Sequence, residues 1–213
     1  MKKKIAIFDL DGTLLNTLLD IGASMNRVLV RHGLPTHTID EYRYIVGNGA
    51  LKIAERASGN ISPESNQQLC DEYNAEYGAH LVEETRPYDG IYDMLDALVE
   101  EGVTIGIFTN KPHKDMQTLM AKLLYMYPWF DANGQKAGVR LKPYPDVLLA
   151  MTEGMDDAEK FFIGDTIVDV ETGHNAHFDT IGCAWGFRGK SELGDADFVA
   201  EHPMDVARYI ISK

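Results

Sequence analysis

The sequence predicts an α/β protein with a doubly wound, Rossmann-like parallel sheet and an all-helical segment inserted after the first strand. The apolar run Ile5 to Phe8 is short enough for a buried strand and ends beside two aspartates. Residues 17–84 show helical spacing and no strand pattern. After residue 86, strand and helix patterns alternate, which is typical of a parallel sheet covered on both faces.

The inserted segment begins with an amphipathic helix. Apolar residues recur there at helical spacing, at Leu18, Ile21, Met25, Val28 and Leu29, and the pattern ends at Gly33-Leu34-Pro35. We expect three more helices at 38–46, 49–58 and 63–84, the last beginning near Ser62-Pro63. The expected division is therefore a core of residues 1–16 and 85–213, with a helical unit of residues 17–84 inserted into it.

The remaining elements follow in alternation. We expect helices at 91–101, 113–126, 145–154, 167–177 and 204–212. We expect strands at 103–108, 161–163, 180–185 and 198–199, with a loop between residues 126 and 145.

The composition indicates an ordinary globular protein and excludes several classes of partner. The 213 residues are 45% hydrophobic, and 20 Lys plus Arg against 33 Asp plus Glu give a net charge of −13. That charge opposes nonspecific attraction to nucleic acid or anionic lipid. No apolar run is long enough for a transmembrane helix or a signal peptide, and Cys70 and Cys183 have no metal-ligand spacing. We therefore expect a cytoplasmic monomer or homodimer without nucleic-acid or membrane partners.

Polar residues follow three of the predicted strands at the carboxyl ends, where open parallel sheets bind ligands. Each could instead be a helix cap, a turn residue or a solvated lysine. Their joint occurrence favours a common site. The set comprises Asp9-Leu10-Asp11-Gly12-Thr13, Thr109-Asn110-Lys111, Gly164-Asp165 with Asp169 one helical turn later, and Lys142 in the segment before the 145–154 helix.

The paired acids after the first strand predict a metal ion. Asp9 and Asp11 would repel each other unless a positive group joined them. Mg²⁺ prefers carboxylate, water and phosphate oxygens, so we expect Asp9 and Asp165 to hold it.

The same residues suit phosphoryl transfer. A carboxylate can attack phosphorus and form an aspartyl-phosphate if the charge of the transferring group is neutralised. Lys142, Thr109 and the backbone N–H groups of Gly12 and Asn110 are expected to bind that group. The second acid, Asp11, would then protonate the leaving oxygen and later activate water.

With these motifs in this order, the chain resembles the haloacid dehalogenase superfamily of phosphatases. DLDGT at 9–13 is similar to its first motif, Thr109 to its second, Lys142 to its third, and Gly164-Asp165 with Asp169 to its fourth. The resemblance extends along the whole chain. Short segments are also similar to the phosphoglycolate phosphatase-like branch, namely GLP, VGNGA, PYDG, TNKP, KPYP and WGFR.

The resemblance implies a role for each motif residue. Asp9 would be nucleophile and metal ligand, and Asp11 would be the acid/base with its backbone carbonyl on Mg²⁺. Thr109 and Lys142 would bind the phosphate. Asp165 would bind the metal directly. Asp169 would not bind the metal itself but would hydrogen-bond the groups that do. Relatives that cleave carbon–halogen bonds lack the second acid, which this chain has.

The leading hypothesis is a Mg²⁺-dependent phosphatase of a small phosphorylated metabolite, with 2-phosphoglycolate as the first guess. Alternatives within the superfamily are a pyrophosphatase, a nucleotidase and a sugar-phosphate phosphatase or mutase. From another class, a phospho-signalling receiver-like module places its acceptor aspartate on a later strand and has no helical insertion. The insertion resembles the family's small cap, and we expect it to close over substrate. Asn48 and Gly49 would then select the leaving group, or form a simple turn between helices.

Overall fold

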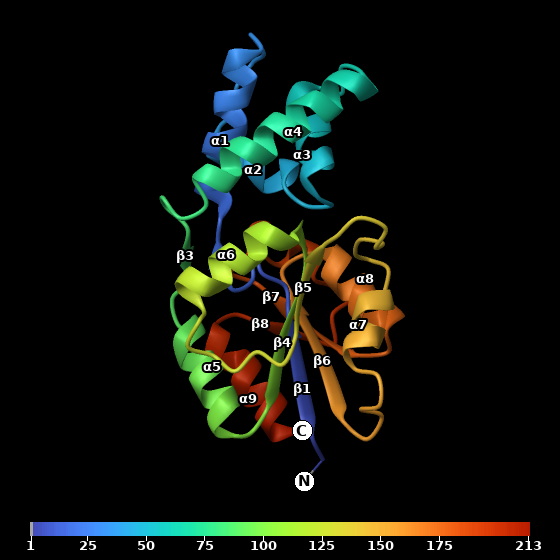
Figure 1. Ribbon diagram of the computed structural model, residues 1–213. Helices are drawn as coiled ribbons and strands as arrows, with labels where there is room; N and C mark the ends of the chain where they lie inside the picture. Colours follow the sequence, from blue (N-terminus) through green and yellow to red (C-terminus); the bar gives the residue numbers. More distant parts are fainter. Residues whose placement is uncertain (1) are drawn as a thin grey trace.

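The computed structural model describes residues 2–213 and shows an α/β core beneath a helical cap (Figure 1). The core sheet has the strand order β5-β4-β1-β6-β7-β8, and all neighbouring strands run parallel. The predicted doubly wound sheet with an inserted helical cap is therefore confirmed. The strands are β1 (Lys4–Phe8), β4 (Thr104–Pro112), β5 (Ala132–Gln135), β6 (Glu159–Gly164), β7 (Asp179–Cys183) and β8 (Phe198–Ala200).

Helices cover both faces of the sheet (Figure 1). One face carries α5 (Ile91–Glu100), α6 (His113–Leu123) and α9 (Pro203–Ser212), and the other carries α7 (Asp146–Met151) and α8 (Ile167–Asn175). Alternate side chains of β1 serve the two faces, with Ala6 and Phe8 in one apolar cluster and Ile5 and Ile7 in the other. A strand buried on both faces reads as an unbroken apolar run, which explains why the sequence predicts it.

The central position of β1 determines where the polar residues gather. Phe8 pairs with Ile107 of β4 on one side and with Ile163 of β6 on the other. The N–H of Asp9 then donates to the carbonyl of Ile163 at 2.8 Å. The carboxyl ends of the three strands therefore adjoin at the edge that faces the cap, while both chain termini lie at the opposite edge (Figure 1).

The cap consists of helices that pack against one another, and their apolar side chains are continuous with the apolar cluster on one face of the sheet. The helices are α1 (Leu18–Arg31), α2 (Ile39–Ile45), α3 (Ala50–Ser58) and α4 (Pro63–Ala79). Their starts follow ordinary capping chemistry: Thr38 and Glu41 form a capping box at α2, and Ser62 caps α4 with Pro63 in its first turn. The helix expected over 63–84 is shorter in the structure, since α4 ends at Ala79.

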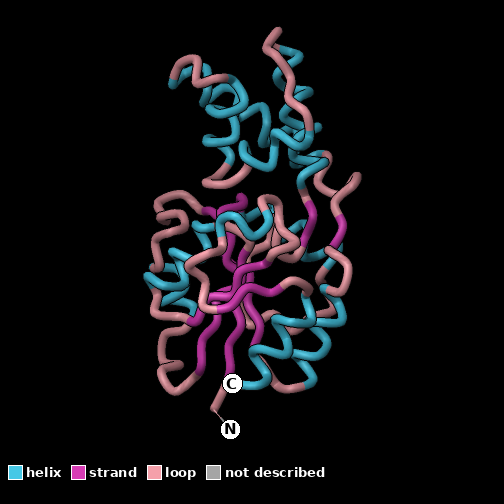
Figure 2. Tube along the Cα trace, turned by 180° about the vertical axis from the view of Figure 1, so that it is seen from behind, coloured by secondary structure: helices cyan, strands magenta, loops and turns pink. Residues whose placement is uncertain are grey.

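The cap joins the core through two short strands, β2 (Leu15–Asn16) and β3 (Arg86–Pro87), which pair antiparallel (Figure 2). Beside them, the buried carboxylate of Asp20 accepts hydrogen bonds from the N–H groups of Glu84 and Thr85 and from the Thr85 hydroxyl, at 2.8 to 3.1 Å. Asp20 thus ties the first turn of α1 to the segment that leaves the cap. The N–H groups of Glu84 and Thr85 therefore donate to the Asp20 carboxylate and not to carbonyls of a continued helix, in agreement with the end of α4 at Ala79.

Three strands lie outside the predicted pattern. β5 falls in the expected loop 126–145, because its residues, ANGQ, contain no apolar run. β2 and β3 have two residues each, too few for any periodic signal. Within residues 2–213, every helix is too short or too polar to cross a membrane.

Candidate active site

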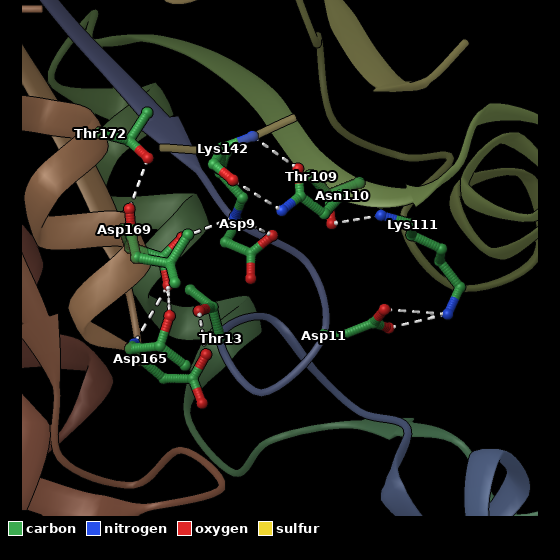
Figure 3. Close-up of polar contacts among 12 residues, drawn as sticks. Asp9, Asp11, Thr13, Thr109, Asn110, Lys111, Lys142, Asp165, Asp169 and Thr172 are labelled. Carbon is green, nitrogen blue, oxygen red and sulfur yellow. Dashed lines mark hydrogen bonds and ion pairs between the residues drawn. The ribbon is translucent and has the colours of Figure 1, made fainter. Parts of the chain in front are cut away.

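The residues at the carboxyl ends of β1, β4 and β6 meet in one cavity beneath the cap; Thr109 and Asn110 lie within β4, which extends to Pro112 and so beyond the expected end at residue 108. The core side of the cavity is lined by Asp9, Thr109, Asn110, Lys142 and Asp165, and Figure 3 shows their arrangement. Asp169, in the first turn of α8, does not line the cavity itself but accepts a hydrogen bond from Nζ of Lys142. The core residues selected from the sequence are thus adjacent in space, although they come from four separate parts of the chain.

Lys142 is the positive centre of this group. Its buried Nζ lies 2.8 Å from Oδ1 of Asp9 and 2.5 Å from Oδ1 of Asp169. Burial alone would lower the pKa of the Lys142 ammonium, but the carboxylates of Asp169 and Asp9 outweigh it and raise the pKa above its usual value. Lys142 is therefore a permanent cation beside Asp9.

Asp9, Asp165 and Asp169 form a buried acidic cluster, with one carboxylate oxygen of each within 4.8 Å of the others. Burial raises the pKa of Asp9 to about 6, against the opposing charge of Lys142. Burial also raises the pKa of Asp165, and the carboxylates of Asp169 and Asp9 raise it further. Three acids thus face one lysine. The cluster therefore has more acidic groups than basic ones, and it offers the oxygen ligands that a divalent cation binds.

The position of Asp165 is fixed by its neighbours. Its Oδ2 accepts the N–H of Phe187 at 2.9 Å, and its Oδ1 accepts the Thr13 hydroxyl at 3.3 Å. Gly12 and Gly186 pack so closely that a Cβ on either would overlap the Asp165 carboxyl group. Gly12 also has a φ of +85°, which favours glycine. Both glycines therefore permit the close approach of main chain to this acid.

The other motif residues hold Lys142 in place. The side-chain amide of Asn110 brackets its main chain, accepting the Lys142 N–H at 2.8 Å and donating to the Lys142 carbonyl at 3.4 Å. Asp169 is itself aligned, since its Oδ2 accepts from the N–H and the hydroxyl of Thr166 at 3.0 and 2.8 Å. The Asn110 side chain is thus engaged with Lys142, which leaves its main chain for the predicted phosphate site; Thr109 is buried and lines the cavity, and its hydroxyl accepts the N–H of Lys111 at 3.3 Å.

Asp11 makes an ion pair that the sequence pattern does not predict. Nζ of Lys111 donates to both its carboxylate oxygens, at 2.9 and 3.0 Å, and to the Tyr77 hydroxyl at 2.7 Å. Tyr77 belongs to α4 of the cap and stacks on Tyr73. The sequence held one signal for Lys111: it follows Thr109 by two residues, so an extended chain places both side chains on the same side.

The cap side of the cavity includes the turn Val46 to Ala50, with the predicted residues Asn48 and Gly49. Gly47, Asn48 and Gly49 have φ values of 109°, 63° and 89°. Glycine and asparagine readily adopt such φ values, and Arg56 supports the turn by donating to the carbonyl of Ile45 at 3.0 Å and to Oδ1 of Asn48 at 2.9 Å. Arg56 is thus a further residue of the site region that its helical spacing alone does not reveal.

Two arginines join cap and core beside the cavity. Arg43 of α2 donates to the carbonyl of Phe187 in the core at 2.9 Å. In return, Arg188 of the core donates to the carbonyls of Arg43 and Val46 in the cap, at 2.8 and 2.9 Å. Because the N–H of Phe187 holds Asp165, the cap is connected to the acidic cluster through one residue of the core.

Comparisons with known proteins agree with this arrangement. The chain is 31% identical to an N-acetylmuramic acid 6-phosphate phosphatase of Pseudomonas aeruginosa, over 97% of this chain and 94% of that protein. It is 34% identical to a phosphoglycolate phosphatase of Agrobacterium fabrum, over 86% and 81%.

Solved structures share the whole fold. A haloacid dehalogenase-like family hydrolase of Streptococcus pneumoniae superposes with a TM-score of 0.86 at 21% identity, over 97% of this chain and 98% of that one. The model of the haloacid dehalogenase-like hydrolase family matches residues 6–183, which include Asp9, Thr109, Lys142, Asp165 and Asp169. The chain is therefore a member of the haloacid dehalogenase-like hydrolase family.

Proposed function

We propose that this phosphoric monoester hydrolase acts on a small phosphorylated metabolite, with 2-phosphoglycolate as the first candidate, through a covalent phosphate on Asp9. The observation that carries the proposal is the position of Asp9 at the end of the central strand, beside Lys142 and open to the cavity. Relatives named as phosphoglycolate phosphatase and N-acetylmuramic acid 6-phosphate phosphatase support phosphate ester hydrolysis.

The phosphoryl group of the substrate would lie between Asp9 and β4. Lys142 and the Thr109 hydroxyl would contact its oxygens, together with the main-chain N–H groups of Gly12 and Asn110. Preorganised donors of this kind stabilise the charge of a transferring phosphoryl group without moving during the reaction. The buried ion pairs of Lys142 and the bonds of Asn110 to its main chain supply that preorganisation.

Hydrolysis would take two steps. In the first, a carboxylate oxygen of Asp9 forms a bond to phosphorus as the ester P–O bond breaks, and the carboxyl group of Asp11 gives its proton to the leaving oxygen. In the second, water attacks the same phosphorus, the bond to Asp9 breaks, and Asp11 takes the proton of the water. The products are an alcohol and inorganic phosphate, and Asp9 returns to a free carboxylate.

The acidic cluster fits Mg²⁺. Asp9 and Asp165 would bind it with their carboxylates and Asp11 with its main-chain carbonyl, while Asp169 would act from outside by orienting Lys142. The fit rests on charge, because three buried acids share a single lysine. When bound, the ion would neutralise charge on the phosphoryl oxygens. Calcium, which takes more ligands at longer distances, suits this compact set less well.

The helical insertion would act as a cover. Taking residues 17–84 as the cap and residues 1–16 and 85–213 as the core, the cap contributes Ile53, Tyr73 and the turn at Asn48 and Gly49 to the cavity. A cover of this kind excludes water, which would otherwise compete for the phosphorylated aspartate and weaken each charge interaction. The turn at Asn48 and Gly49 would face the leaving group and take part in selecting it.

The test is phosphate release from a panel of phosphate esters and one anhydride in the presence of Mg²⁺. The panel includes 2-phosphoglycolate, a sugar 6-phosphate, a nucleoside monophosphate and pyrophosphate, compared by kcat/KM. Asp9→Asn should abolish release from every member, because it removes the nucleophile and a metal ligand together. Substrate labelled in its phosphoryl group should leave label on the quenched wild-type chain, and hydroxylamine should release it. A well-folded Asp9→Asn variant with substantial turnover would favour direct attack by water.

A further inference from the structure

Lys111 occupies an unusual place among the charged residues of the cavity. Its side chain is only 2% exposed, yet it lines the cavity and bonds one residue from each part of the protein. From the core it binds both oxygens of Asp11, and from the cap it binds the hydroxyl of Tyr77. Its Nζ also lies 4.5 Å from the centre of the Tyr77 ring. Lys111 is thus a buried cation whose main partner is a carboxylate.

That carboxylate belongs to the residue assigned to proton transfer. In Figure 3 the side chain of Asp11 points toward Lys111 and away from the carboxylate of Asp9. Nothing in this arrangement places the Asp11 carboxyl beside an ester bound at Asp9. For Asp11 to reach the leaving oxygen, it has to give up both hydrogen bonds from Lys111. A buried lysine left without a partner is costly, so this release requires a substitute anion.

We infer that Lys111 is the receptor for a carboxylate in the leaving group of the substrate. This carboxylate replaces Asp11 on Lys111, and the released Asp11 carboxylate takes up a proton from solvent, which it then gives to the leaving oxygen. The inference rests on the proposed function and narrows it to phosphate esters that carry a carboxylate close to the ester oxygen. Exchange of one carboxylate for another leaves the charge around Lys111 unchanged. The hydrogen bond to Tyr77 can persist throughout.

The position of Lys111 suits a short substrate. Thr109 and Lys111 lie two residues apart near the end of β4, where its pairing with β5 is irregular, so their Cα atoms can be at most about 7 Å apart. An ester bound at Thr109 through its phosphoryl group therefore has its second or third carbon atom within reach of the flexible Lys111 side chain. A carboxylate at that place can take both hydrogen bonds that Asp11 now accepts.

The other cationic side chains that line the cavity have different hydrogen-bond and ion-pair partners. Lys142 pairs with Asp9 and Asp169. The guanidinium groups of Arg43 and Arg188 donate to main-chain carbonyls across the junction of cap and core. None of these three cations pairs with Asp11, the residue assigned to proton transfer. Among the described residues of the cavity, Lys111 is the cation whose carboxylate partner, Asp11, has to leave it before proton transfer to the leaving oxygen.

The test compares two esters of nearly equal size, 2-phosphoglycolate and 2-hydroxyethyl phosphate, which differ by a carboxylate in place of a hydroxymethyl group. Wild type should favour 2-phosphoglycolate in kcat/KM. Lys111→Gln should reduce that preference about 30-fold or more, mainly through loss on the carboxylate ester, because a buried charge pair is broken. Tyr77→Phe, which removes one hydroxyl, should reduce the preference only a few-fold. Lys111→Arg should restore part of it.

Two controls separate recognition from structural damage. Lys114→Gln makes the same chemical change at an exposed site on α6 and should leave the preference unchanged. Inhibition by 3-phosphonopropionate, relative to propylphosphonate, reports carboxylate recognition without any catalytic step, and Lys111→Gln should abolish the difference between these two inhibitors.

The outcomes are distinguishable. Equal losses on both esters in Lys111→Gln, with the inhibitor difference retained, would make Lys111 a structural residue and overturn the inference while the proposed phosphatase function stands. The same holds if wild type shows no preference for the carboxylate ester. If wild type releases phosphate from no ester of the wider panel, the proposed function itself fails.

Discussion

A pH titration of stability, with and without Mg²⁺, tests the acidic cluster directly. Asp9 is buried, and that burial raises its pKa from the ordinary value of 3.8 to about 6. A carboxyl group whose pKa is raised on folding favours the folded state while it is protonated. Its contribution is therefore complete below pH 3.8, the pKa in the unfolded chain, and is lost as the pH rises through 6.

The magnitude follows from the change in pKa. A pKa raised by about two units corresponds to about 3 kcal/mol of unfolding free energy, which the metal-free protein loses between pH 4 and pH 7. For a chain of this length that is a change of roughly 6 to 12 °C in Tm. Asp165 acts in the same direction, since burial raises its pKa as well. Mg²⁺ binds the ionised carboxylates, so its stabilising effect should be larger at pH 7 than at pH 5.

Urea unfolding followed by tryptophan fluorescence, at pH 5 and pH 7 with Mg²⁺ or EDTA, measures both effects. Asp9→Asn keeps the shape of the side chain without its charge. In EDTA at pH 7 it should be more stable than wild type, and Mg²⁺ should stabilise it little. Asp195→Asn, at an exposed position, should behave as wild type. Equal stabilisation by Mg²⁺ at the two pH values, or undiminished stabilisation of Asp9→Asn, would refute the reasoning.

Three further outcomes check other parts of the site. Activity lost in EDTA should return with Mg²⁺ and return poorly with Ca²⁺, and full activity in EDTA would contradict the metal site. Asn48→His adds bulk to the turn but keeps a residue type that tolerates a φ of 63°. The order of kcat/KM values among phosphate esters should therefore change, while methyl phosphate is still hydrolysed. An unchanged order would place substrate selection elsewhere in the protein. Asp20→Ala leaves the buried donors of Thr85 unpaired and should lower the unfolding free energy by about 3 kcal/mol in urea titrations, against almost no change for the exposed Asp157→Ala. A loss below about 1 kcal/mol would mean that Asp20 does not anchor the cap.

The strands that carry the site are predictable because of their burial. β1, β4 and β6 lie inside the sheet, where both faces are covered, so their sequences read as short apolar runs. Residues at the carboxyl end of such a strand have a fixed position at the sheet edge, which is why Asp9, Thr109 and Asp165 could be placed together. β5 lies at the edge and pairs through its main chain with one neighbour, so its polar residues Asn133 and Gln135 give no strand signal.

Contacts between separate elements leave no such pattern. Lys111 and Tyr77 lie 34 residues apart, on a core strand and a cap helix, and each alone reads as an ordinary residue of its element. Arg188 reaches the carbonyl of Val46 across 142 residues. These pairings depend on how the cap is seated on the core, which neither periodicity nor capping signals describe. The clustering of the core residues was therefore predictable, whereas the groups that connect the core to the cap were not.

The strand pair β2 and β3 makes the cap a separable piece of the chain. Leu15 pairs with Pro87 and Asn16 with Arg86, so the chain leaves the core and returns to it at neighbouring points. Paired strands lie about 5 Å apart, a gap that a tight turn closes as readily as a long insertion. The entropy of closing a loop grows only with the logarithm of its length. Covers of different size can therefore be exchanged at this junction during evolution or by design, each presenting the same reaction to a different set of molecules.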